Sequence, residues 1–168
     1  MTKEEFRKLT ENILILDGAT GSNLMASGMP RGICTETVGY RSTKILSRIC
    51  SVPIFQAGSQ VIYAPTFGGN SINLEKHGLK EIRLKRSNRT LVGYSKELAG
   101  SGIYVAGDIT TSGSFITADG DYTYTEAYNM YQEQIRILAD AGIDLIAAET
   151  MINIERNSCS CRCRRFCM

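Results

Sequence analysis

The sequence predicts an α/β protein with parallel strands, of the (β/α)8 TIM-barrel type but limited to about the first four strand–helix units. The main observation is a ten-residue block that begins at residues 57, 99 and 141, and so recurs every 42 residues. Each block holds a short, nearly continuous apolar run, which is typical of a strand buried on both faces of a parallel sheet. Small and polar residues follow each run, and then a helical stretch, which is the alternation of α/β folds.

The expected strands follow from these apolar runs. The first lies over residues 13–17, where ILILD precedes the repeated blocks, and the blocks predict strands over 60–65, 103–108 and 143–149. An Ala-Gly pair opens each block and predicts the end of a helix, because glycine readily adopts the left-handed conformation at a helix C-terminus. A doubly wound sheet shows the same alternation as a barrel. A complete barrel needs about 250 residues, so four strands in a chain of 168 residues amount to half of one.

Two helix signals are specific enough to place. Residues 125–141 predict a helix, and the side chains that share its apolar face are Ala127, Met130, Tyr131, Gln134, Ile135 and Leu138. His77 and Gly78 predict the end of another helix, where glycine and a cationic side chain are both favoured. The single histidine of the chain is therefore interpreted as structural rather than catalytic.

The composition excludes several classes of partner. The chain is 43% apolar and 21% charged, with a formal charge of +2. Three arginines lie close to the C-terminal end, at positions 162, 164 and 165, so the rest is slightly acidic and does not favour nucleic acid. The charged N-terminal stretch lacks the apolar core of a signal peptide, and the aliphatic run of 13–16 is too short to span a bilayer. We expect a cytoplasmic protein with neither nucleic acid nor membrane as partner.

Polar residues at the strand ends form the candidate site, because ligands of parallel α/β proteins bind at the carboxyl ends of the strands. The residues there are Asp17, Gly18, Thr66, Phe67, Asp108 and Glu149. The turn DGATGS lacks the lysine and the spacing of nucleotide-binding loops. Its amide N–H groups suit an anion and the carboxylates suit an ammonium group, as in an amino acid. The structural alternative is that aspartate or threonine at a strand end caps the next helix.

Five segments in this order resemble the homocysteine S-methyltransferase family. They are DGATGSNL from residue 17, CTET at 34–37, AGSQVIYAPTFGGN at 57–70, GDITTSG at 107–113 and AGIDLIAAETM at 141–151. Within that family, the longer string DGDYTYTEAYNMYQEQIRILADAGIDLIAAETM is most similar to the N-terminal homocysteine-binding module of cobalamin-dependent methionine synthases. The resemblance covers about residues 11–155, with gaps.

The resemblance implies a (β/α)8 barrel that transfers a methyl group to the sulfur of homocysteine, giving methionine. It implies that Asp17 and Gly18 lie at the amino-acid end of the substrate and that Glu149 receives its ammonium group. It further implies that Thr66, Phe67 and Asp108 line the pocket, while it identifies no catalytic residue here. The implied methyl donor is methylcobalamin, recharged from methyltetrahydrofolate in separate cobalamin and folate modules. Betaine or S-methylmethionine is the alternative donor.

The resemblance also implies zinc, which would deprotonate the substrate thiol. The zinc cysteines of the family lie in the second half of the barrel and include a Gly-Gly-Cys-Cys-Gly pattern, which this sequence lacks. Cys34 and Cys50 match no ligand position, so we assign no metal ligand. The family pattern also weakens over 38–55 and 80–88, as a shifted reading frame would produce.

The C-terminal cysteines do not replace these ligands. Cys159, Cys161, Cys163 and Cys167 alternate with arginine and serine instead of forming the CxxC pairs of structural zinc sites. We therefore expect two regions, a partial homocysteine-binding barrel domain over 1–155 and a tail over 156–168 that is disordered or out of frame. The alternative to a methyltransferase domain is an inactive fragment. Such a fragment would self-associate through open sheet edges, join a C-terminal half-barrel, or bind thiols or metal adventitiously.

Overall fold

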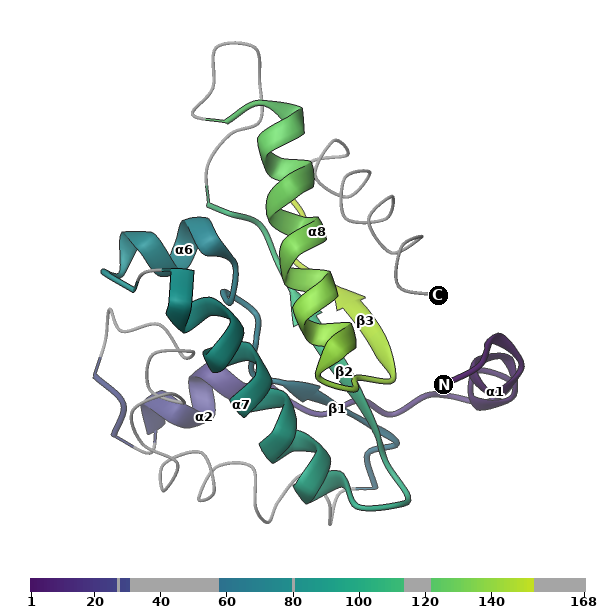
Figure 1. Cartoon of the computed structure of the whole chain (residues 1–168). Helices are drawn as coiled ribbons and strands as arrows, with labels where there is room; N and C mark the ends of the chain where they lie inside the picture. The colour runs from purple at the N-terminus through teal and green to yellow at the C-terminus, as the bar shows by residue number, and fades with distance from the viewer. Residues whose placement is uncertain (27, 31–57, 80, 114–121, 153–168) are drawn as a thin grey trace.

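The computed structural model of the chain describes residues 1–26, 28–30, 58–79, 81–113 and 122–152 (Figure 1). Within these ranges the sheet has three parallel strands in the order β1 (Val61–Ala64), β2 (Tyr104–Ile109) and β3 (Leu145–Ala148). These are the three strands predicted from the repeated blocks, with bounds that differ by one or two residues. The prediction of parallel strands is therefore confirmed.

The strand predicted over 13–17 is reduced to a single bridge. Leu16 pairs in parallel with Val61, and the Gln60 amide donates to the Ile15 carbonyl at 2.9 Å. The Ser59 hydroxyl adds a bond of 3.2 Å to the Leu16 carbonyl. The segment therefore lies along the outer side of β1 and carries Asp17 to the end of the sheet.

Helices separate the strands in the predicted way. The helices are α1 (Lys3–Leu9), α2 (Thr20–Ala26), α6 (Ser71–Lys76), α7 (Glu81–Ala99) and α8 (Tyr124–Asp140). The last begins with a capping box, in which the Glu126 amide donates to the Thr123 hydroxyl and the Thr123 amide donates to the Glu126 carboxylate. This reciprocal pair satisfies two amides that the first helical turn would leave unbonded.

Two of the three Ala-Gly pairs end a described helix as predicted, one after α7 and one after α8. Gly100 and Gly142 have φ values of 57° and 91°, in the left-handed region that favours glycine. Gly58 has a φ of 85°, but the residues before it lie outside the described ranges. At the end of α6, His77 is the C-cap and Gly78 has a φ of 71°. The predicted position of His77 and Gly78 at the end of a helix is therefore confirmed.

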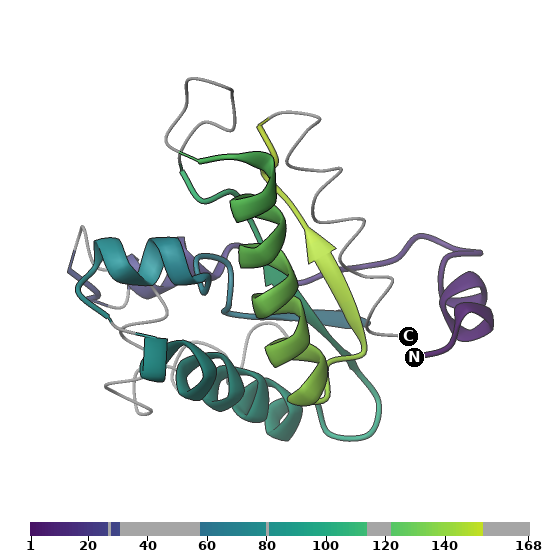
Figure 2. The same ribbon diagram turned by 45° about the horizontal axis from the view of Figure 1, so that its top comes forward.

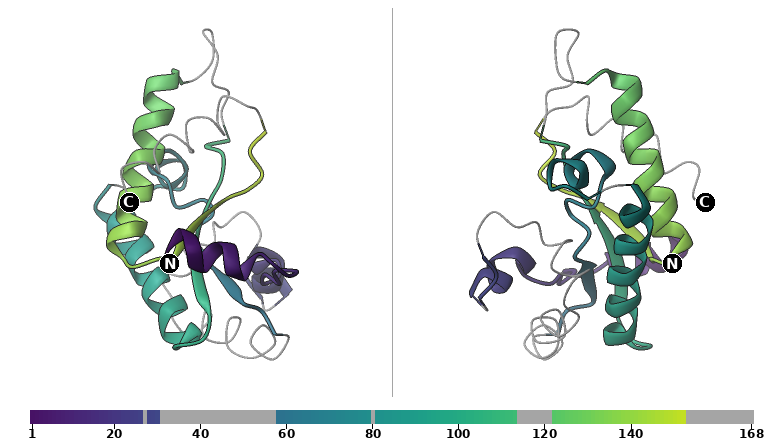
Figure 3. Two further views of the ribbon diagram at one scale, coloured as in Figure 1. Left: turned by 90° about the vertical axis from the view of Figure 1, so that its right-hand side faces the viewer. Right: turned by 60° about the vertical axis from the view of Figure 1, so that its left-hand side comes forward.

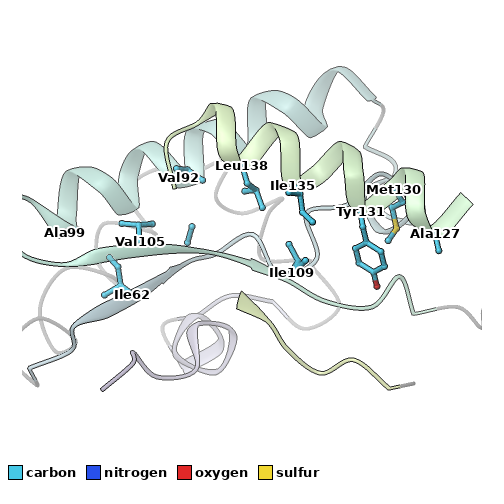
Figure 4. Close-up of a cluster of buried hydrophobic side chains, with 11 residues drawn as sticks. Ile62, Val92, Ala99, Val105, Ile109, Ala127, Met130, Tyr131, Ile135 and Leu138 are labelled. Carbon is cyan, nitrogen blue, oxygen red and sulfur yellow. The ribbon is translucent and has the colours of Figure 1, made fainter. Parts of the chain in front are cut away.

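The core lies between the sheet and the two long helices. Both α7 and α8 lie on one side of the strands, α2 lies on the opposite side, and α8 crosses in front of β2 (Figures 2 and 3). Ile62, Val105 and Ile109 point from the strands towards α8 (Figure 4). All six residues predicted on the apolar face of α8 are buried. Side chains alternate along a strand, so Tyr63 and Asp108 fall on the other face of the sheet.

The stretch 80–88, where the family pattern weakens, lies almost wholly within α7. Leu84 and Asn88 are buried, and the Asn88 amide group donates to the carbonyls of Gly69 at 2.8 Å and Leu84 at 2.9 Å. This helix therefore packs through side chains of that stretch. The shifted reading frame stays a hypothesis.

Several predictions fall outside the described residues. They concern the stretch 38–55, the tail 156–168 and all six cysteines of the chain. Across the part of the chain that the structure does describe, no helix combines the length and the apolar character needed to cross a bilayer.

Candidate functional site

Asp17 is held at the end of the sheet by β1. The Tyr63 amide donates to its Oδ2 at 2.9 Å. Its other oxygen, Oδ1, is buried and has no hydrogen-bond partner among the residues that the structure describes. Buried polar atoms are normally bonded, so an acceptor left unused in this way favours a ligand or water as its partner. Asp17 is therefore able to accept a further hydrogen bond.

The electrostatics of Asp17 bring in Glu149. The pKa of the Asp17 carboxyl is raised to about 6, mainly by burial and to a smaller extent by the negative charge of Glu149, while amide hydrogen bonds from Tyr63 and Asp17 itself oppose the change. The charge of Glu149 thus acts on Asp17 although the two residues are 132 positions apart in the sequence. Such a pair favours a cation between or beside its members.

Tyr63 lies where three carboxylates act together. Its pKa is raised by burial first and then by the charges of Glu149, Asp108 and Asp17. Glu149 directly follows β3, Asp108 lies in β2, and Asp17 lies in the segment before α2. The structure thus brings together the three acidic residues that the sequence predicted at the strand ends.

Thr66 has a structural task in this arrangement. Its side chain is fully buried, and its hydroxyl donates to the Asp108 carbonyl at 2.9 Å and accepts from the Asp108 amide at 3.2 Å. The buried Gln134 side chain donates to the Thr66 carbonyl at 2.9 Å. Thr66 therefore ties the end of β1 to β2 and fixes the backbone of Asp108. Its predicted contact with substrate stays a prediction, as does that of the neighbouring half-buried Phe67.

Glu149 follows β3 directly and its side chain is exposed. Its amide donates to the Ile109 carbonyl at 3.1 Å, and its carbonyl accepts from the Thr110 hydroxyl at 3.0 Å. The next residue, Thr150, has a φ of 55°. The backbone of Glu149 is therefore fixed by β2 although its carboxylate reaches solvent.

Gly18 is exposed beside Asp17, just before α2. A Cβ atom at this position would have nothing within 4 Å, and its φ lies outside the left-handed region. Neither crowding nor backbone conformation within the chain therefore requires glycine here. The missing side chain leaves space next to the Asp17 carboxylate, which agrees with a position against a ligand.

Three residues of this region were not predicted from the sequence, namely Tyr63, Thr110 and Gln134 in its contact with Thr66. Strand alternation could have indicated Tyr63, because it lies opposite the apolar positions of β1. Thr110 and Gln134 each donate to a backbone carbonyl of a neighbouring segment. Which carbonyl lies within reach depends on how the segments pack, and no sequence pattern predicts it.

The residues that the structure describes do not form a zinc site. No group of three or more His, Cys, Asp or Glu side chains among them could hold a metal ion. The only histidine caps α6, and every cysteine lies outside the described ranges. A surface hollow lies elsewhere, between α7 and α8, where Lys85, Arg136 and Asp140 line it. None of the six predicted site residues lines that hollow.

Comparison with known proteins gives a consistent match. The family model described as homocysteine S-methyltransferase matches residues 14–163. A curated protein with the same description, from Escherichia coli (strain K12), is 26% identical over 170 residues, which cover 86% of this chain and 52% of the relative. The chain thus spans about half the length of that relative.

Solved structures show the same fold. The metallated form of the homocysteine methyltransferase MmuM from Escherichia coli superposes with a TM-score of 0.77 at 18% identity, covering 95% of this chain and 62% of that one. The oxidized form of MmuM gives a TM-score of 0.76 at 22% identity, covering 96% and 61%. At these identities the likeness supports the fold and does not by itself assign a reaction.

Proposed function

Since the chain belongs to the homocysteine S-methyltransferase family, we propose that its strand ends form the amino-acid-binding part of a homocysteine methyltransferase site. The observation that carries this proposal is that Asp17, Asp108 and Glu149 lie at the same end of the parallel sheet. The Tyr63 amide of β1 donates to the Asp17 carboxylate, and the Glu149 amide donates to the last carbonyl of β2. The reaction proposed is methyl transfer to the thiol of homocysteine, giving methionine. In this proposal the reaction takes place in the cytoplasm.

Charge complementarity supports the assignment of the ammonium group. An amino acid carries one cation, and Glu149 offers an exposed carboxylate on a backbone that is bonded to the end of β2 and to Thr110. Asp17 adds Oδ1, which is buried and has no partner within the described ranges. A bound ammonium would lower the pKa of Asp17, because an opposite charge favours the ionised carboxyl. Ligand binding would thus relieve the repulsion between the two acids.

The sulfur end of the substrate needs a thiolate, since a free thiol has a pKa near about 8.5 and is mostly protonated at neutral pH. Zinc supplies that deprotonation in the family to which the sequence is similar. The described residues provide no set of ligands for it, so their proposed task is confined to holding the amino-acid end. Methylcobalamin, supplied with folate by other modules, remains the proposed methyl donor.

A second candidate is a fragment that acts by association with another half-barrel or with a second copy of itself. Exposed apolar side chains at both sides of the sheet favour it. Ile13, on the segment beside β1, is 88% exposed, and Ile152, just after β3, is 68% exposed. Strand edges and apolar side chains of this kind promote pairing with further strands.

Calorimetric titration of the full chain with homocysteine tests the first candidate. Replacing Glu149 by Gln should weaken binding by about 30-fold, or about 2 kcal/mol, because one charge-assisted contact is lost. Unchanged affinity would remove Glu149 from the site. Absence of binding by the wild-type chain would contradict the proposed function itself.

A further inference from the structure

We propose that Thr110 is a positioning residue that fixes the direction in which Glu149 leaves the sheet; its bearing on substrate rests on the proposed function above. Thr110 follows β2 directly, and its side chain is only 3% exposed. Its hydroxyl donates to the Glu149 carbonyl at 3.0 Å. A buried hydroxyl thus bonds the peptide group that follows the proposed ammonium-binding residue.

The backbone around Glu149 needs such support. Thr150 has a φ of 55°, which a β-branched residue rarely adopts and which strains the backbone. Strain of this kind persists only where neighbouring contacts hold the chain. The Thr110 bond acts on the peptide group between Glu149 and Thr150, so it acts on the strained turn directly.

The same turn is held from its other side. The hydroxyl of Tyr131, a fully buried residue of α8, lies 3.6 Å from Sδ of Met151 and donates to it. Contacts from β2 and α8 therefore lie on both sides of Thr150. The exposed side chain of Glu149 can rotate, but its backbone is held in place. This reduces the conformational entropy that is lost when a ligand binds.

An equivalent contact occurs one strand earlier. Thr66, buried after β1, bonds the backbone of Asp108 through its hydroxyl just as Thr110 bonds that of Glu149. In both cases a threonine that follows one strand bonds the backbone of an acidic residue in, or directly after, the next strand. Because the contact occurs twice, we infer that the two hydroxyls hold the acidic residues in position rather than merely filling space beside one strand.

Amide hydrogen exchange of the full chain measures the positioning without any ligand. The Glu149 amide is bonded to Ile109, and the Asp144 amide, at the start of the β3 region, is bonded to Val105 at 2.8 Å. In Thr110→Val, the Glu149 amide should exchange about tenfold faster while the Asp144 amide is unchanged. Thr110→Ser keeps the hydroxyl and should restore the protection, and Thr110→Ala should behave like valine. Equal acceleration of both amides, or of neither, would overturn the positioning role.

Titration with homocysteine then measures its effect on the ligand. Thr110→Val should weaken binding about tenfold in the wild-type background and have no further effect when Glu149 is already Gln. Thr90→Val, on α7, is the matched control and should bind like wild type. If the losses of affinity caused by Thr110→Val and Glu149→Gln add up in the double variant, Thr110 does not act through Glu149. If the wild-type chain binds no homocysteine, the proposed function fails, while the exchange of the Glu149 amide still decides whether Thr110 fixes that residue.

Discussion

Asp17 lies half-buried between the N-terminal segment and β1, and burial raises its pKa from 3.8 to about 6. The unfolded chain therefore loses this proton at a lower pH than the folded chain does. Between about pH 4 and pH 6 the folded state binds more protons, so stability falls as the pH rises through this window and then levels. An ionised Asp17 that suits an ammonium ligand thus destabilises the chain without ligand.

Replacing Asp17 by Asn should remove this loss of stability. At pH 8 the variant should be more stable than wild type by on the order of 1 kcal/mol, less than the pKa change alone would give, because water reaches part of the carboxyl. At pH 4 the two proteins should have similar stability. Urea unfolding at both values measures the difference, with Glu97→Gln, on the exposed side of α7, as control. A variant that is less stable than wild type at pH 8 would contradict the effect.

The sequence could predict which residues lie in the acidic cluster but not how each is held. Asp17, Asp108 and Glu149 were predictable because strand ends in a parallel sheet meet at one edge. The raised pKa of Asp17 depends on burial by other parts of the chain, which periodicity does not report. The bonds of Thr66 and Thr110 depend on the register between strands, which fixes the carbonyl that each hydroxyl meets.

At the scale of elements, the turn after β1 depends on its contact with α7. A Cβ atom on Gly69 would lie 2.6 Å from Oδ1 of Asn88 and 2.9 Å from the Thr66 carbonyl oxygen. Gly69→Ala should therefore destabilise the chain by about 2 kcal/mol, since a fully buried side chain and a backbone oxygen must both move. Chemical denaturation measures this loss.

Gly93 provides the matched control within α7. It is exposed, and a Cβ atom there would have nothing within 4 Å, so Gly93→Ala should stabilise the helix by about 0.5–1 kcal/mol. Equal effects of the two substitutions would show that the Gly69–Asn88 contact does not join the turn to α7. The repeat could predict the turn and its Ala-Gly helix ends, whereas this contact involves a stretch in which the family pattern is weak.

At the scale of the whole molecule, the 42-residue repeat predicted the parallel sheet and the alternation of its helices. It could not predict that the segment 13–17 would pair through one bridge only. Exposed Ile13 and Ile152 lie at the two sides of the sheet. Neither residue belongs to the acidic cluster, so the two bear on association rather than on the site.

If the chain associates through these sides, its average molecular mass in analytical ultracentrifugation should rise with protein concentration. Replacing Ile13 and Ile152 together by Lys should increase the monomer fraction, because charged side chains oppose edge-to-edge pairing. Phe6→Lys on α1 is the control, since Phe6 is exposed but does not lie on a strand. A wild-type chain that stays monomeric at every concentration would rule out this association.

Recognition of an ammonium group by the acidic cluster is tested most directly by titrating the full chain at pH 7.5 with homocysteine and with 4-mercaptobutyrate, which lacks only the amino group. Wild type should bind homocysteine at least about tenfold more tightly, and Glu149→Gln should remove most of this difference while Glu97→Gln keeps it. Equal affinity of wild type for the two ligands, or an undiminished preference in Glu149→Gln, would contradict the proposed site.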